Sequence, residues 1–139
     1  ILVKALAERI DASQGAAVVV LHQLGNHGPV YYKRYPDSFR KFLPACESSE
    51  LGDCSREQIV NAYDNGILYT DDVLARAIHL LGQQAGRDTA LVYLSDHGES
   101  LGEGGLYLHG MPYAIAPDEQ KKVPMTMRRT KLWRSPAVR

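Results

Sequence analysis

Residues 55–94 read SREQIVNAYDNGILYTDDVLARAIHLLGQQAGRDTALVYL, and this stretch decides the fold class. Its first four residues have the form of a capping box, which predicts the start of a helix. Apolar residues then recur at helical spacing as far as Gly82 or Gly86, which indicates one long helix. Residues 89–94 follow as an apolar run without alternation, and such a run is typical of a strand buried on both faces.

The residues before this stretch continue the alternation of helix and strand. Residues 1–12 have the pattern of an amphipathic helix, and residues 16–21, AAVVVL, have that of another strand buried on both faces. A helix, a strand, a long helix and a strand in this order predict an α/β sheet with parallel strands. Within the long helix, we expect strain at Asn65-Gly66 because glycine costs ~1 kcal/mol in a helix interior.

The composition indicates one globular domain. Of 139 residues, 45% are hydrophobic and 23% are charged, which excludes disordered, collagen-like and coiled-coil chains. The net charge is zero, so no global field favours nucleic acid. Residues 126–139 hold five basic and no acidic residues, whereas residues 1–125 hold eleven basic and sixteen acidic ones. The chain begins at Ile1 without a signal-peptide pattern, so we expect a processed or excised piece.

Both predicted strands end in polar loops that carry histidines. His27 follows the first strand, Asp96 and His97 follow the second, and His109 lies farther along in a glycine-rich loop. Ligands of open α/β sheets bind at the carboxyl ends of the strands. A carboxylate and imidazoles are normal ligands of zinc. The residues therefore leave two interpretations open, a metal or phosphate site and a set of solvated loop residues.

Neighbouring residues add to this candidate site. Glu99 and Glu103 are candidates to orient ligating histidines through hydrogen bonds, although loop solvation explains them equally well. Gly98 is expected to let the chain bend, so that the two residues before it turn toward one point. We expect His22 to be packed or paired and His79, on the long helix, to be solvated.

Cys46 and Cys54 enclose seven residues and lack the CxxC spacing of metal sites. A short disulfide loop is one interpretation, worth ~2.5 kcal/mol in the chain-entropy model. It would imply an oxidising compartment. Two free thiols in a reducing compartment are the other interpretation.

Several longer motifs follow one another in the chain: LHQLGNHGP at 21–29, YKRYP at 32–36, CESS at 46–49, SDHGESLGE at 95–103 and YLHGMPY at 107–113. Together they resemble the lipid A phosphoethanolamine transferases, a family that includes the mobile colistin-resistance enzymes. The resemblance covers residues 1–125 almost without interruption. It implies that this chain is the C-terminal part of a periplasmic catalytic domain, with an alkaline-phosphatase or sulfatase-like α/β sheet and flanking helices.

The resemblance also implies an activity and a set of site residues. The family transfers phosphoethanolamine from phosphatidylethanolamine to a lipid A phosphate, at the periplasmic face of the inner membrane, to which N-terminal helices tether it. The implied roles are zinc ligands for Asp96 and His97, a phosphate or second-zinc site for His27 and His109, and a disulfide for Cys46 and Cys54. The family's threonine nucleophile has no counterpart in this chain, so we expect the chain alone to be inactive.

Other interpretations stay open beside this one. A related phosphoglycerol transferase or sulfatase, or a non-catalytic product of a truncated gene, would share these motifs. After Met125 the family continues into a hydrophobic strand, whereas residues 126–139 are expected to form a divergent basic tail, either accidental or a lipid-binding arm. Because half of a sheet leaves a strand edge uncovered, we expect the isolated chain to be marginally stable or to self-associate.

Overall fold

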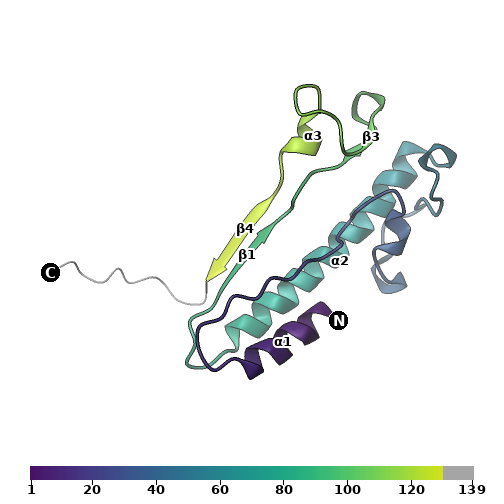
Figure 1. The fold of residues 1–139 in the computed structure, drawn as a ribbon. Helices are drawn as coiled ribbons and strands as arrows, with labels where there is room; N and C mark the ends of the chain where they lie inside the picture. The colour runs from purple at the N-terminus through teal and green to yellow at the C-terminus, as the bar shows by residue number, and fades with distance from the viewer. Residues whose placement is uncertain (130–139) are drawn as a thin grey trace.

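The structure is a computed structural model that describes residues 1–129. In this part of the chain, the helices are α1 (Leu2–Ala12), α2 (Arg56–Gly82) and α3 (Asp118–Lys121), and the strands are β1 (Ala90–Leu94), β2 (Ser100–Leu101), β3 (Tyr107–Leu108) and β4 (Met125–Arg129). Short 3₁₀ turns lie at η1 (Tyr31–Lys33), η2 (Asp37–Phe39), η3 (Leu51–Asp53) and η4 (Glu103–Gly105). Figure 1 shows α2 as the central helix, with α1 beside its C-terminal half. No helix within residues 1–129 combines the length and hydropathy needed to cross a bilayer.

The long helix predicted after Ser55 is confirmed as α2, which runs for 27 residues. Its capping box is complete, because Gln58 N donates to Ser55 Oγ at 3.2 Å and Ser55 N donates to Gln58 Oε1 at 2.8 Å. The helix predicted over residues 1–12 is confirmed as α1, which buries Leu6 and contacts α2. Periodicity and capping therefore locate both helices correctly.

The strain expected at Asn65-Gly66 does not interrupt the helix, since α2 passes through both residues without a break, and the energetic cost of the glycine stays a prediction. At both residues, a loop from elsewhere in the chain contacts the helix. A Cβ on Gly66 would lie 2.5 Å from Asn26 Oδ1, so the missing side chain lets the loop before His27 lie directly on the helix. Asn65 is fully buried, and its Oδ1 accepts from the backbone N–H of Lys41 at 2.7 Å.

The predicted disulfide between Cys46 and Cys54 is present, with Cα atoms 5.7 Å apart. Cys46 is buried, and its backbone N–H donates to Gln58 O at 2.9 Å, which fixes the cystine loop against the start of α2. The core cluster of this end of the molecule contains Tyr31, Ala45, Cys46, Ile59 and Ala62. The loop that leads away from His27 is thereby anchored on the helix.

The two segments predicted as parallel neighbours do not pair. Residues 16–21 form no strand, and β1 pairs instead with β4, antiparallel, from Ala90 opposite Arg129 to Leu94 opposite Met125. An open groove of about 1430 Å³ separates residues 16–21 from β1. Adjacent strands stand only ~4.8 Å apart, so two segments that face each other across a groove of this size are not neighbours in a sheet.

The burial predicted for these segments is also incomplete. Val18 and Val20 are 93% and 85% exposed, and in β1 the side chains of Val92 and Leu94 are 56% and 59% exposed. Only the opposite face of β1, with Leu91 and Tyr93, is partly buried. Apolar runs without alternation predict burial on two faces, but among residues 1–129 only one face of β1 is covered.

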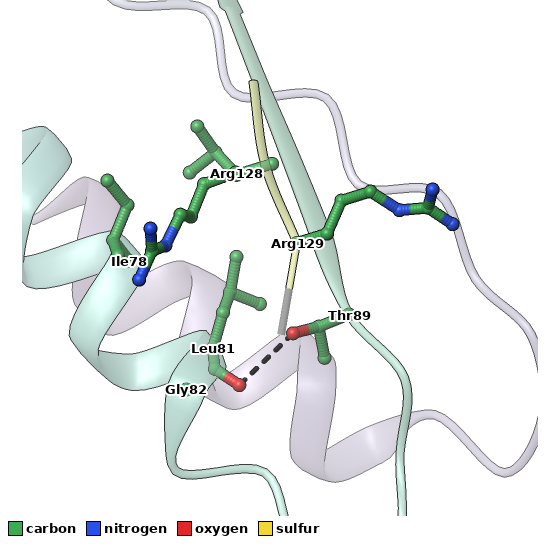
Figure 2. A pocket seen from close by; sticks show the side chains of 7 residues that line it. Ile78, Leu81, Gly82, Thr89, Arg128 and Arg129 are labelled. Carbon is green, nitrogen blue, oxygen red and sulfur yellow. Dashed lines mark hydrogen bonds between the residues drawn. The ribbon is translucent and has the colours of Figure 1, made fainter. Parts of the chain in front are cut away.

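The basic segment expected to be a non-periodic tail begins as part of a sheet. Residues 126–129 lie in β4, because the edge of β1 offers backbone hydrogen bonds to any side-chain composition. Figure 2 shows the Arg128 side chain turned toward Ile78 of α2 and the Arg129 side chain turned away. They border a cavity of about 200 Å³, in which Thr89 Oγ1 donates to Leu81 O at 3.2 Å. The domain boundary at residue 125 stays a prediction, and residues 130–139 lie outside the described residues.

Candidate metal centre

Three histidines from three separate loops meet at one point. His27 precedes η1, His97 follows β1 and His109 follows β3. One ligand atom from each lies within 4.8 Å of the other two. The rings of His97 and His109 are stacked with centroids 3.8 Å apart, and His27 stands edge-on, 4.9 Å from His109 and 5.7 Å from His97. The fold thus brings together three of the four residues predicted to bind metal or phosphate.

All three rings use the same nitrogen to form a hydrogen bond with their surroundings. In each, Nδ1 faces an oxygen acceptor: Gly28 O at 2.9 Å from His27, Gly98 O at 2.9 Å from His97, and Glu99 Oε2 at 2.7 Å from His109. Carbonyl and carboxylate oxygens accept hydrogen bonds, so Nδ1 is the donor in each ring, which leaves Nε2 as the nitrogen available to a ligand. Metal-binding histidines are held in this way, and the donor set therefore fits a metal ion.

Asp96 lies at the rim of the cluster. Its side chain is 80% exposed, and Oδ1 is 4.0 Å from His97 Nε2. Two ligands of one tetrahedral zinc stand about 3.3 Å apart, so a small side-chain rotation would let both bind one ion. Slight burial raises the pKa of Asp96, but hydrogen bonds from backbone N–H groups and the charges of His97 and His22 outweigh it and lower the pKa below its ordinary value.

Glu99 lies directly behind His109. Its side chain is only 4% exposed, and it accepts from His109 Nδ1 through Oε2 and from Tyr31 Oη at 2.5 Å through Oε1. Burial, the hydrogen bond to Glu99 and the charge of Glu99 raise the pKa of Tyr31 far above its ordinary value, so Tyr31 is a donor here. The position of Glu99 suits the predicted orienting role, which stays a prediction.

For Glu103, the structure shows neither the orienting contact nor simple loop solvation, the two interpretations left open by the sequence. Its Oε1 pairs with Arg56 Nη2 at 2.9 Å, and its Oε2 accepts from Leu101 N at 2.6 Å. Glu103 therefore ties the β2–β3 hairpin to the start of α2, away from the histidine rings. His22 is exposed rather than packed, and His79 is exposed on α2 as expected.

Gly98 acts through close approach rather than through an unusual dihedral angle. It is not among the glycines with positive φ, but a Cβ added to it would overlap the carbonyl oxygen of Glu119. Its backbone N–H donates to Gln120 O at 3.1 Å, so the loop after β1 lies directly on α3. The sequence motif alone does not reveal this contact, because it involves residues more than twenty positions away.

Gln120 and Tyr31 are the site residues that the sequence analysis missed. Gln120 is buried, donates through Nε2 to Ser100 Oγ at 2.9 Å and accepts from Met111 N at 3.3 Å, so it links the two ends of the segment that carries His109. Tyr31 reaches Glu99 across 68 positions of sequence. Both residues act through contacts that are distant in the sequence, so no local signal could have identified them.

Comparison with known proteins gives a consistent result. The sulfatase family profile matches residues 1–139. Phosphoethanolamine transferase EptA of Escherichia coli K12 is 56% identical over 128 residues, which cover 91% of this chain and 23% of EptA. Phosphatidylethanolamine transferase Mcr-1 of Escherichia coli is 54% identical over 108 residues, which cover 77% of this chain and 20% of Mcr-1. This chain therefore spans less than a quarter of the length of either relative.

A solved structure matches the fold as well as the sequence. The crystal structure of the C-terminal periplasmic domain of phosphoethanolamine transferase EptC from Campylobacter jejuni is 49% identical and superposes with a TM-score of 0.88. The match covers 91% of this chain and 41% of that domain. The predicted sulfatase-like α/β class is thereby confirmed, and the described residues form part of such a domain.

Proposed function

The chain belongs to the sulfatase family, and the relatives that it resembles are phosphoethanolamine transferases. We propose that the whole protein transfers phosphoethanolamine from phosphatidylethanolamine to a lipid A phosphate. The observation that carries the proposal is the cluster of three histidines with Nε2 atoms available to a ligand. Such a cluster suits metal-assisted chemistry on a phosphate group. In this proposal the chain supplies part of the catalytic domain, and the nucleophile comes from elsewhere in the whole protein.

We propose that the metal is Zn²⁺, held by Asp96 and His97, with His27 and His109 holding the phosphate or a second zinc. Imidazole nitrogen and carboxylate oxygen are the donors that zinc prefers beside thiolate. When bound, zinc would lower the pKa of the nucleophile and screen the charge that develops on the transferred phosphoryl group. The rings of His97 and His109 are stacked with centroids 3.8 Å apart, so the two proposed sites are adjacent.

The chain's own contribution is to orient these donors. The His27 loop rests on α2 at Gly66, the Asp96–Glu99 loop rests on α3 at Gly98, and the His109 loop is held through Glu99 and Gln120. The loop of each histidine is therefore fixed by a contact to a neighbouring element, whereas the exposed side chain of Asp96 is not. Donors held in advance bind a metal and a phosphate without a large cost in side-chain entropy.

We further propose that the protein acts at the periplasmic face of the bacterial inner membrane. The EptC structure is that of a periplasmic domain, and a disulfide suits an oxidising compartment. Attachment to the membrane would come from helices elsewhere in the whole protein. The balanced charge of this chain gives no reason to expect a nucleic-acid partner.

The test is a headgroup-transfer assay on the whole protein in membranes. We expect phosphoethanolamine to appear on lipid A when phosphatidylethanolamine is the donor, and we expect cells that make the protein to survive more colistin. Phosphatidylglycerol and an aryl sulfate serve as competing substrates in the same assay. Transfer of phosphoglycerol or hydrolysis of sulfate, without phosphoethanolamine transfer, would contradict the proposal and favour a related enzyme of the family.

We also propose that the isolated chain self-associates. The groove beside β1 exposes valine and leucine side chains, and the facing edge of β1 has no strand partner among residues 1–129. Edges and apolar surfaces of this kind attract other chains. Sedimentation velocity at several concentrations should show oligomers that grow with concentration. A strict monomer with a sharp, concentration-independent thermal transition would rule this out.

A further inference from the structure

Glu99 is clamped between two donors in the interior of the molecule. Its carboxylate accepts from His109 Nδ1 at 2.7 Å on one oxygen and from Tyr31 Oη at 2.5 Å on the other. With a side chain 4% exposed, Glu99 has little access to water that could replace either donor. A buried carboxylate that loses a donor has no water to replace it, so each donor constrains the position of Glu99.

Tyr31 is held as tightly as the carboxylate. It begins η1, is 1% exposed and belongs to the core cluster, where its ring meets that of Tyr63 edge-on at 5.6 Å. Gly28 closes the space above the hydrogen bond, because a Cβ there would lie 2.7 Å from both Glu99 Oε1 and Tyr31 Oη. The hydroxyl of Tyr31 therefore has one available acceptor in this packing, Glu99 Oε1.

We propose that Tyr31 is a positioning residue for the metal centre and acts on His109 through Glu99. The tyrosine hydroxyl occupies Oε1, so that Oε2 is left for His109 Nδ1 and the His109 ring is held beside the rings of His27 and His97. Two consecutive hydrogen bonds, from Tyr31 to Glu99 and from His109 to Glu99, thus link the hydrophobic core to the histidine cluster. This inference rests on the proposed function, since it takes the three histidines to be a metal centre.

The geometry distinguishes this role from plain core packing. The Tyr31 ring packs against Tyr63, but its hydroxyl contributes only the bond to Glu99 among the described hydrogen bonds. Tyr31→Phe therefore keeps the packing and removes the link. Changes to residues that orient metal ligands typically weaken metal binding 10–100-fold, and Tyr31 is one step farther from the metal than Glu99.

The test is the zinc affinity of the whole protein after it has been purified and stripped of metal. We expect Tyr31→Phe to weaken zinc binding about tenfold. Tyr35→Phe is the matched control: Tyr35 Oη accepts from Asn65 Nδ2 at 3.3 Å, so this variant also loses a hydroxyl contact, but one that does not involve Glu99. The control should bind zinc as the wild type does. Thermal unfolding of the metal-free variants verifies that each is folded.

A double-mutant cycle shows whether Tyr31 acts through Glu99. In a Glu99→Ala background, Tyr31→Phe should cause no further loss of zinc affinity. If Tyr31→Phe fails to fold, Glu99→Gln tests the same link, because an NH2 group, which cannot accept a hydrogen bond, replaces one of the two carboxylate oxygens that accept from Tyr31 and His109. Zinc binding should then weaken to a similar extent. Unchanged affinity in the folded single variant, or an equal loss in both backgrounds, would overturn the inference. A wild type that binds no zinc would instead overturn the proposed function, and the inference with it.

Discussion

His97→Ala is expected to abolish tight zinc binding by the whole protein and to lower the rate of headgroup transfer by roughly a thousandfold, since a bound metal contributes several kcal/mol of transition-state stabilisation. The ring of His97 lies between Asp96 and His109, and its Nδ1 is already occupied by Gly98 O. Removing it takes away one of the two proposed zinc ligands and the ring that stacks on His109 of the second pair. Titration with zinc, followed by bound metal and by melting temperature, measures the first effect, and the transfer assay measures the second.

The controls for this prediction come from the same chain. Asp96→Ala should act in the same direction, because its carboxylate is the proposed partner of His97 on zinc. His79→Ala should change nothing, because His79 lies exposed on α2 with Nε2 next to the Gln83 side chain. Equal losses of zinc binding in all three variants would mean that the histidines bind zinc adventitiously, and the assignment of the centre would be wrong.

Gly98→Ala is expected to destabilise the folded protein by about 3 kcal/mol and to weaken zinc binding as well. An added Cβ would overlap the backbone carbonyl oxygen of Glu119, which cannot move aside as the end of a flexible side chain could. The loop must therefore leave α3, losing the hydrogen bond from Gly98 N to Gln120 O and displacing its neighbour His97. Thermal unfolding and zinc titration of the purified whole protein measure the two effects.

Gly15→Ala is the matched substitution for Gly98→Ala. It adds the same methyl group where no atom lies within 4 Å and where φ is not positive. Its melting temperature and zinc affinity should equal those of the wild type. A Gly98→Ala variant with the same melting temperature as the wild type would contradict the close packing of this loop on α3.

The helices were predictable because their signals are local. The capping box at Ser55 and the repeat of apolar residues require only neighbouring positions to interact, and α2 follows them closely. The strands were less predictable, because a strand needs a partner and the partner of β1 in this chain is the basic segment Met125–Arg129. Nothing in an apolar run such as residues 16–21 specifies which backbone will lie beside it.

The sequence by itself determined the chemistry available to this protein: histidines and an aspartate in loops, two cysteines at disulfide spacing, and motifs of a transferase family. The tertiary structure decided which of these groups meet. It brought three histidines together and left Asp96 at the rim of their cluster. It also paired Glu103 with Arg56 in an ion pair and connected Tyr31 to Glu99 by a hydrogen bond across 68 positions of sequence. The physical reason is that side-chain type sets which contacts are favourable, whereas close packing over long sequence separations sets which contacts are made.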